Sequence, residues 1–205
     1  MCFETLKHRF IQFGIVRITI KDITQLYRFK RHDIRSFQLD GMHDRTITIE
    51  SFSKTYSVTG WHVGYALAGK ENTARLRKIH DFLTVSAPAP LQHSCVAALR
   101  LSESYYPELA REYSRKRRIL FDGLRHAGFA CQLPEGAYYI FTDISGFGMN
   151  DTEFARYLVE KAGVAAVPGS SFYHDGGATK LRFTFSKKDE TLVEACRRLE
   201  TLELG

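Results

Sequence analysis

The stretch Ser51-Phe52-Ser53-Lys54-Thr55-Tyr56-Ser57-Val58-Thr59-Gly60-Trp61 decides how this chain folds, and it follows a β-prone segment, Thr46-Ile47-Thr48-Ile49. We expect a strand over residues 46–49 with Lys54 in the loop after it, where sheet proteins commonly place reactive groups. A lysine amine can form a Schiff base with an aldehyde once burial or a nearby cation lowers its pKa. The hydroxyl and backbone N–H groups of Ser51 and Ser53 suit a phosphate. The stretch therefore predicts a pyridoxal phosphate site.

Lys54 alone has a plainer interpretation, because most lysines are solvated surface charges. Other motifs favour the functional one: Thr59-Gly60-Trp61-His62-Val63-Gly64-Tyr65, Pro134-Glu135-Gly136-Ala137-Tyr138-Tyr139-Ile140-Phe141, Val167-Pro168-Gly169-Ser170-Ser171-Phe172 and Leu181-Arg182-Phe183-Thr184-Phe185-Ser186. In this order, from about residue 41 to residue 204, they resemble class I/II aminotransferases of fold type I, in particular the aspartate and aromatic types. The motifs correspond to the family's lysine signature, its small-domain glycine turn, its Pro-Gly turn and the strand holding the carboxylate-binding arginine.

The resemblance implies an α/β fold, namely a partial fold type I structure. Residues 41–120 would be a remnant of the large, mixed-sheet domain that binds pyridoxal phosphate. Residues 121–205 would form the small C-terminal domain, and residues 1–40 match the family poorly. The sequence pattern predicts strands near residues 46–49, 63–68, 130–132, 138–142, 165–167 and 181–186, and helices near residues 71–83, 91–102, 105–126, 151–162 and 189–202. Asp151 or Thr152 is the expected N-cap of the fourth helix.

The resemblance assigns two catalytic tasks to Lys54: it forms the Schiff base with the cofactor, and it later moves the proton on the substrate Cα. Ser51 and Ser53 would bind the cofactor, and Arg182 would hold the substrate α-carboxylate with its planar fork. Arg182 alternates with Leu181 and Phe183, so an ordinary outward-facing strand arginine is the competing interpretation. Tyr138 and Tyr139 are expected in the β-sheet core, with a place in the lining of the site as the alternative for Tyr139. Tyr56 and Trp61 are expected to pack around the Lys54 loop.

Two further cofactor ligands depart from the family pattern. His62 stands where the family usually has an arginine or lysine to hold the phosphate. Because a histidine has a reference pKa of about 6.5 and is only partly charged at neutral pH, we expect lowered cofactor affinity. Asp22 lies at a distance before Lys54 that suits the aspartate that pairs with the pyridinium nitrogen. The tyrosine that the family places soon after is absent at its offset, and Tyr27 comes two positions late, so an ordinary loop aspartate remains the alternative.

The leading functional prediction is a pyridoxal phosphate-dependent transaminase acting on an amino acid and a 2-oxo acid. A lyase of the same fold and a non-catalytic fragment or binding module are the alternatives. The family's chains are much longer than 205 residues. We therefore expect the C-terminal portion of an aminotransferase, a truncated form that has weak activity or none alone and that forms a homodimer or associates with a complementary chain.

The amino-acid composition limits the other classes of protein to which this chain could belong. Hydrophobic residues make up 44% of the chain and charged residues 25%, as in an ordinary globular protein. The net charge of +6 could suggest nucleic acid. However, the densest basic run, Arg115-Lys116-Arg117-Arg118, lies in a predicted helix with acidic neighbours and indicates a solvated face. The four cysteines have no metal-ligand spacing and no apolar stretch suits a membrane, so we expect a cytoplasmic protein without a metal.

Overall fold

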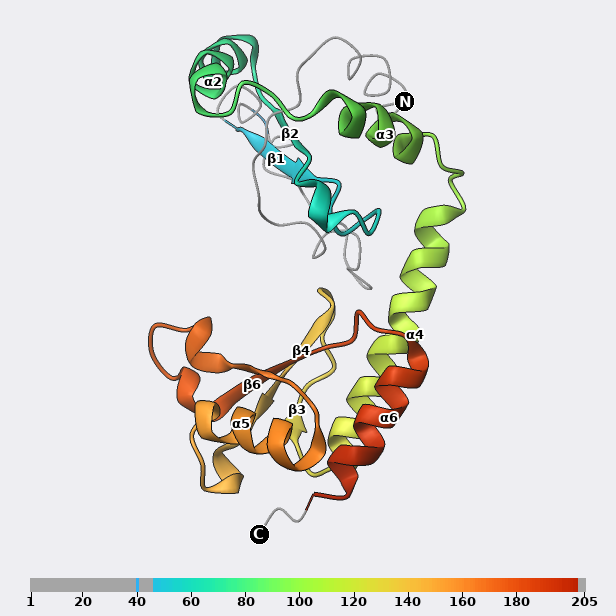
Figure 1. The fold of residues 1–205 in the computed structure, drawn as a ribbon, viewed down its shortest axis with the longest axis vertical. Helices are drawn as coiled ribbons and strands as arrows, with labels where there is room; N and C mark the ends of the chain where they lie inside the picture. The colour runs from blue at the N-terminus through green and yellow to red at the C-terminus, as the bar shows by residue number, and fades with distance from the viewer. Residues whose placement is uncertain (1–39, 41–45, 203–205) are drawn as a thin grey trace. The chain divides into compact units, whose positions relative to one another are not determined.

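The computed structural model describes Asp40 and residues 46–202 (Figure 1). The chain divides into two compact units, of which the first ends at Tyr105 and the second begins at Tyr106. The division into family domains at residues 41–120 and 121–205 stays a prediction. Asp22 lies outside the described residues, as do most of the residues expected to match the family poorly.

The first unit is built around an antiparallel pair of strands. Strand β1 (Thr48–Ser51) pairs with β2 (Gly64–Leu67), so that Ser51 lies opposite Gly64. The observed β1 is shifted by two residues from the expected strand, because its ladder with β2 begins at the pair Thr48–Leu67 and ends at the pair Ser51–Gly64. A short 3-10 helix, η3 (Thr59–Trp61), lies in the connection between the strands. Two helices follow, α2 (Lys70–Leu83) and α3 (Ala89–Leu99).

A small apolar cluster holds the first unit together. Its buried members come from the loop after β1, the start of β2 and the α3 region: Phe52, Val63, Ala87 and Cys95. The rings of Tyr56 and Trp61 pack against this cluster, as predicted. The apolar composition of residues 91–102 predicts a buried helix, and this prediction is wrong, because Cys95 is the only buried residue of α3.

Helix α2 has apolar residues near one face, but that face is not buried. None of its residues is buried, and Ile79 and Leu83 are 59% and 74% exposed. The apolar spacing of this helix is real, but no element among the described residues covers it. Hydrophobic periodicity identifies such a face without identifying what packs against it.

The second unit is a four-stranded antiparallel sheet with helices. Helix α4 (Tyr105–His126) begins at the last residue of the first unit and leads into β3 (Ala130–Cys131) and β4 (Tyr139–Asp143). Helix α5 (Asp151–Ala162), β5 (Val167–Pro168), β6 (Lys180–Thr184) and α6 (Asp189–Glu200) complete it. The strand order is β3-β4-β6-β5, so the two longest strands are central. Three short 3-10 helices, η4 (Ser145–Phe147), η5 (Gly169–Ser171) and η6 (Gly177–Thr179), lie in the connections.

The two faces of this sheet differ. Burial alternates along β4 and β6, which puts Ile140, Leu181 and Phe183 in the core. Helices α4, α5 and α6 add Leu120, Leu124, Phe154, Leu158, Leu192 and Leu199 to that core, and residues such as Phe129, Ile144 and Phe185 from the connections also belong to it. The opposite face carries the half-buried residues Tyr139, Phe141, Asp143, Lys180, Arg182 and Thr184. We call this the open face; the prediction that Tyr139 belongs to the core is therefore wrong.

The start of α5 corrects one prediction. Asn150, rather than Asp151 or Thr152, is the N-cap, because its side chain accepts hydrogen bonds from the N–H groups of Thr152 and Glu153 while the Glu153 side chain accepts one from the Asn150 N–H. This capping box provides hydrogen-bond acceptors for backbone N–H groups at the start of the helix. Asp151 thus becomes the first helical residue, and its carboxylate is available for another contact.

The basic run in α4 is only partly a solvated face. Arg115 and Arg118 are exposed, but Arg117 is half-buried and its Nη1 donates to the carbonyl oxygen of Pro134 at 2.6 Å. Arg115 forms an ion pair with Asp189, the first residue of α6. No helix in the described part of the chain combines the length and the apolar character needed to cross a membrane.

Candidate active site

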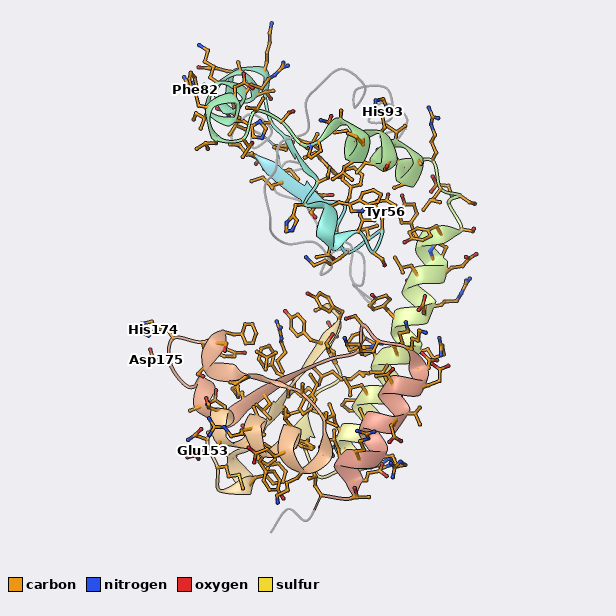
Figure 2. All side chains as sticks on the ribbon, viewed as in Figure 1. Tyr56, Phe82, His93, Glu153, His174 and Asp175 are labelled. Carbon is orange, nitrogen blue, oxygen red and sulfur yellow. The ribbon has the colours of Figure 1, made fainter. Side chains whose placement is uncertain are left out.

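Lys54 lies in a tight loop that begins where β1 ends, and Figure 2 labels Tyr56 of the same loop. The N–H of Phe52 donates to the Val63 carbonyl at 3.1 Å, which extends the strand pairing by one step. The N–H of Val58 donates to the Ser53 carbonyl at 2.8 Å and closes the loop around Lys54. Ser57 adopts a left-handed conformation with φ of 56°. Backbone bonds on both sides therefore fix the position of the Lys54 backbone.

The residues on both sides of Lys54 are buried in the loop, whereas Lys54 itself is not. Ser53 and Thr55 are 7% exposed, and Phe52 is 1% exposed, whereas Lys54 is half-buried. The Ser51 hydroxyl oxygen accepts a hydrogen bond from the Ser53 N–H at 3.0 Å. Two of the predicted cofactor ligands thus contact each other directly, and the third, Lys54, follows them in the same loop.

Tyr105 supports this loop from a distant part of the sequence. Its hydroxyl donates to the Thr55 carbonyl at 2.5 Å, and its ring stacks on Tyr56 at a centroid distance of 5.9 Å and an interplanar angle of 10°. The sequence pattern does not predict this contact, because fifty positions separate Tyr105 from Thr55 and nothing in the local pattern of α4 distinguishes Tyr105 from a packing tyrosine.

His62 ends the connection between the two strands. It has a left-handed backbone with φ of 52°, and its N–H donates to the Thr59 carbonyl at 3.3 Å. Histidine tolerates this conformation better than most non-glycine residues. Its side chain is exposed, which leaves the imidazole accessible to a ligand. The fifth predicted ligand, Asp22, lies outside the described residues.

The residues of the Lys54 loop fit pyridoxal phosphate. The cofactor needs an amine for its aldehyde and hydrogen-bond donors or cations for its phosphate. The loop offers the Lys54 amine, the Ser51 hydroxyl and the His62 imidazole. The Ser51 oxygen uses a lone pair for the Ser53 N–H, so its own proton can still be donated to an anion.

Arg182 lies on the open face of the second unit. It is opposite Phe141 on β4 and opposite Val167 on β5. Its guanidinium carbon lies 4.1 Å from the ring centroid of Phe172 and 5.0 Å from that of Tyr139. Among the residues that the structure describes, no carboxylate lies within ion-pair distance of this guanidinium. The donors of the Arg182 fork are therefore suited to an external carboxylate.

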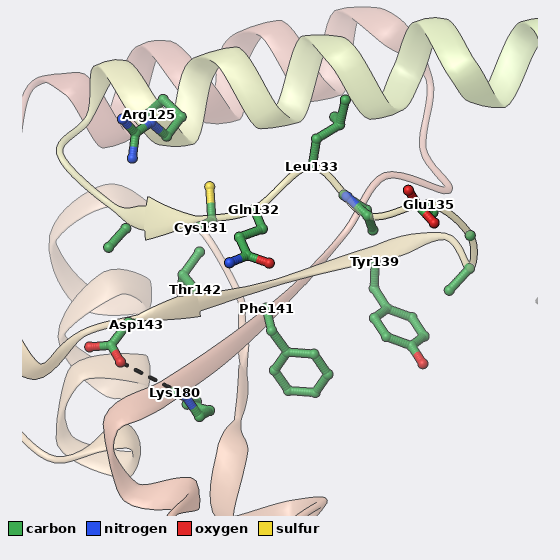
Figure 3. A pocket seen from close by; sticks show the side chains of 14 residues that line it. Arg125, Cys131, Gln132, Leu133, Glu135, Tyr139, Phe141, Thr142, Asp143 and Lys180 are labelled. Carbon is green, nitrogen blue, oxygen red and sulfur yellow. Dashed lines mark ion pairs between the residues drawn. The ribbon is translucent and has the colours of Figure 1, made fainter. Parts of the chain in front are cut away.

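A pocket of about 670 Å³ lies beside β3 and β4 (Figure 3). The open-face residues Tyr139, Phe141, Asp143 and Lys180 contribute to its lining. Asp143 and Lys180 form an ion pair at 3.8 Å. Hydrogen bonds from the Ser145 hydroxyl and N–H, with a smaller contribution from Lys180, hold the pKa of Asp143 below its usual value. Since this cation is paired, Arg182 is better placed than Lys180 to receive a second anion.

The predicted site residues thus fall into two groups. Ser51, Ser53 and Lys54 share one loop of the first unit, and Arg182 belongs to the sheet of the second unit. The sequence analysis did not identify Phe172 as a neighbour of Arg182. The alternation of β6 could have placed Arg182 opposite the core, but the contact from the loop after β5 depends on tertiary structure.

Comparison with known proteins gives a consistent result. The family model for aminotransferase class I and II matches residues 25–199, which begins after Asp22. Methionine aminotransferase of Escherichia coli is 37% identical over 163 residues, which are 78% of this chain and 42% of that protein. A probable N-succinyldiaminopimelate aminotransferase of Mycobacterium tuberculosis is 38% identical over 174 residues, which are 80% of this chain and 44% of that protein. The chain therefore spans less than half the length of these curated relatives.

Solved structures agree with the sequence comparison. The Escherichia coli methionine aminotransferase structure has a TM-score of 0.80 at 33% identity and covers 88% of this chain and 48% of its own. An aromatic aminotransferase from Pyrococcus horikoshii has a TM-score of 0.78 at 29% identity and covers 97% of this chain and 53% of its own. The predicted partial fold type I structure is confirmed, and so is pyridoxal phosphate as the cofactor of the family. This chain belongs to the class I and II aminotransferases, a pyridoxal phosphate-dependent family.

Proposed function

We propose that this chain takes part in transamination, the transfer of an amino group between an L-amino acid and a 2-oxo acid. The observation that carries the proposal is the placement of Lys54: a half-buried lysine in a hydrogen-bonded loop at the end of β1, one residue after Ser53, whose N–H donates to the Ser51 hydroxyl oxygen. Membership of the aminotransferase family supports the same reaction.

Each predicted residue has a task in this proposal. Pyridoxal phosphate, when bound, supplies the electron sink that stabilises negative charge at the substrate Cα. Lys54 holds the cofactor aldehyde and moves the proton at that carbon. Ser51, Ser53 and His62 hold the phosphate, and Arg182 binds the substrate α-carboxylate with two parallel N–H donors. Asp22 is kept as the proposed partner of the pyridinium nitrogen.

A lyase reaction is not favoured by any specific observation. The relatives and solved structures described above are named aminotransferases. We therefore propose transamination over β-elimination. We also propose that the chain by itself turns over weakly and that it works as a homodimer or with a complementary chain.

The test is the visible absorbance of the purified chain incubated with pyridoxal phosphate, before and after borohydride reduction. Lys54→Ala is the test variant. Lys70→Ala is the matched control, because Lys70 is an exposed lysine at the start of α2 in the same unit. Peptide mass spectrometry of the reduced protein then locates the attached cofactor.

We expect a borohydride-sensitive band in the unaltered chain and in Lys70→Ala, with the reduced cofactor on the peptide that contains Lys54. The band should be lost in Lys54→Ala. Incubation with an amino donor and a 2-oxo acid should then yield a new amino acid rather than ammonia. A band that survives in Lys54→Ala, or label spread over surface lysines, would contradict the assignment.

A further inference from the structure

The side chain of Arg182 is contacted from both sides of its own strand. Tyr139 reaches it from β4, and Phe172 reaches it from the loop that follows β5. Both contacts place the guanidinium over an aromatic ring. Such a contact attracts the cation to the ring face and does not require a lone-pair acceptor, so it leaves the N–H donors of the guanidinium for another partner.

The Phe172 ring has a defined place because the turn before it is anchored. The N–H groups of Phe172 and Tyr173 donate to the Gly169 carbonyl at 2.8 and 3.2 Å. A Cβ atom on Gly169 would come within 2.4 Å of the Gly177 carbonyl oxygen, so the turn packs closely against η6. The edge of Phe141 supports the Phe172 ring, with 5.8 Å between the centroids and an interplanar angle of 86°.

A buried carboxylate fixes the same turn. Asp151 is 3% exposed, and its Oδ2 accepts a hydrogen bond from the Ser170 N–H at 2.8 Å. Its Oδ1 accepts one from the Thr152 N–H at 2.9 Å in the first turn of α5. Asp151 therefore ties the start of α5 to the residue two positions before Phe172, and this link is available because Asn150 serves as the N-cap.

We propose that Phe172 is a positioning residue for the Arg182 guanidinium, and that Asp151 acts on Arg182 through Phe172 by anchoring the turn at Ser170. This inference rests on the proposed role of Arg182 as the carboxylate ligand. An arginine side chain has many rotamers, and holding its planar fork in one orientation lowers the entropy lost when a carboxylate binds. Phe172 thereby contributes to substrate affinity without touching substrate.

The experiment follows the Arg182 Nε–Hε resonance in ¹⁵N-labelled protein, assigned with Arg182→Lys. Phe172→Leu is the test variant, and Phe172→Tyr is the conservative one. Tyr173→Leu is the matched control, because Tyr173 is 43% exposed where Phe172 is 45%, and it contacts Phe141 rather than Arg182. The probe is 3-phenylpropionate, a carboxylate that has no amino group to react with the cofactor.

In the free protein we expect Phe172→Leu to move and broaden the Arg182 Nε–Hε resonance, because the ring current and the fixed orientation are lost. Phe172→Tyr and Tyr173→Leu should leave it close to its original position. In the titration, losing one cation–π contact should weaken 3-phenylpropionate binding about fivefold in Phe172→Leu. Equal spectra and equal affinities in Phe172→Leu and Tyr173→Leu would overturn the proposal.

The link to Asp151 is tested by a double-variant comparison. Asp151→Asn should shift the resonance in the unaltered background and should have no further effect once Phe172 is leucine, because it acts through that ring. Additive effects would overturn the role of Asp151. If 3-phenylpropionate does not perturb Arg182 in the unaltered chain, the carboxylate-binding role fails, while the free-protein spectra still decide whether Phe172 orients the guanidinium.

Discussion

His62 is the residue whose replacement should strengthen cofactor binding. It is exposed and follows η3, in the position where the family resemblance implies a phosphate ligand. An arginine presents five N–H donors in a rigid fork that matches a phosphate, whereas an imidazole presents at most two. We expect His62→Arg to tighten pyridoxal phosphate binding by about tenfold, the effect of roughly 1.4 kcal/mol in a charge-assisted hydrogen bond.

The measurement is an equilibrium titration of the chain with pyridoxal phosphate. His93→Arg is the control for the added charge, because His93 is an exposed histidine of α3 in the same unit (Figure 2). Equal tightening in both variants would show that net charge, rather than the position of residue 62, governs the affinity.

Asp151 should make stability depend on pH. Burial acts to raise its pKa, but hydrogen bonds from Ser170 and Thr152 outweigh this, and the pKa lies below the usual carboxyl value. A carboxyl group with a lowered folded-state pKa stabilises the fold above its unfolded pKa, and this contribution is lost as pH falls through the folded value. We expect Asp151→Asn to destabilise the chain by about 1–2 kcal/mol at pH 7.

The free energy of unfolding of both proteins is measured by urea unfolding at several pH values, with circular dichroism as the signal. Below about pH 4, where carboxyl groups begin to protonate, the stability of the unaltered chain should fall more steeply than that of Asp151→Asn. In the described part of the chain, Asp143 and Glu194 also have a lowered pKa, but they are present in both proteins and cancel in the difference. Parallel pH profiles would contradict the prediction.

At the scale of elements, the close contact between α4 and α6 depends on a glycine, Gly123, which has no side chain. A Cβ atom on Gly123 would lie 2.2 Å from the Sγ and 2.5 Å from the Cβ of Cys196. Alanine favours a helix interior over glycine by about 1 kcal/mol. Overpacking a core contact costs about 1–3 kcal/mol, and this clash involves atoms close to the backbone, so we expect Gly123→Ala to destabilise the chain.

Urea unfolding of Gly123→Ala against the unaltered chain measures the effect. Gly146→Ala is the control, because a Cβ atom there has nothing within 4 Å and the residue does not have a left-handed backbone. We expect the control to change stability by less than about 0.5 kcal/mol. A Gly123→Ala protein as stable as the control would show that α6 can move away from α4 at little cost.

The elements also show how far the sequence determines the structure. Helix α4 has the expected bounds, residues 105–126, because its apolar spacing and the glycine at 128 are local signals. The apolar residues of α2 and α3 do not lead to buried helices, because a sequence pattern identifies an apolar face but not what packs against it. In the candidate site, the roles of Lys54 and Arg182 stay predictions from motifs. The contact of Tyr105 with the Lys54 loop joins residues fifty positions apart, and the contact of Phe172 with Arg182 depends on how the chain after β5 folds, so the sequence pattern predicts neither.

At the scale of the whole molecule, the two units differ in how much core they bury. Among the described residues, the apolar cluster of the second unit has sixteen buried members and that of the first has four. The hydrophobic contribution to stability grows with the apolar area removed from water. We therefore expect the first unit, which carries the Lys54 loop, to unfold at a lower urea concentration than the second.

Two probes distinguish the units without altering the chain. Trp61 is the only tryptophan and belongs to the first unit, so its fluorescence follows that unit alone. Cys196 is buried between α6 and α4 in the second unit, and its labelling by a thiol reagent, identified by peptide mass spectrometry, follows the opening of that core. The Trp61 midpoint should come first, and coincident midpoints would mean that the units unfold together.

Cofactor binding should narrow the difference between the unfolding midpoints of the two units. A ligand that binds only the folded form stabilises by an amount that grows with its concentration relative to its dissociation constant, about 2.7 kcal/mol at a hundredfold excess. Pyridoxal phosphate held by the Lys54 loop should therefore raise the Trp61 midpoint and leave the Cys196 midpoint in place, and Lys54→Ala should abolish the shift. If both midpoints rise equally, the cofactor stabilises the two units as one structure, and the Lys54 loop is not the element that it selectively holds in the folded form.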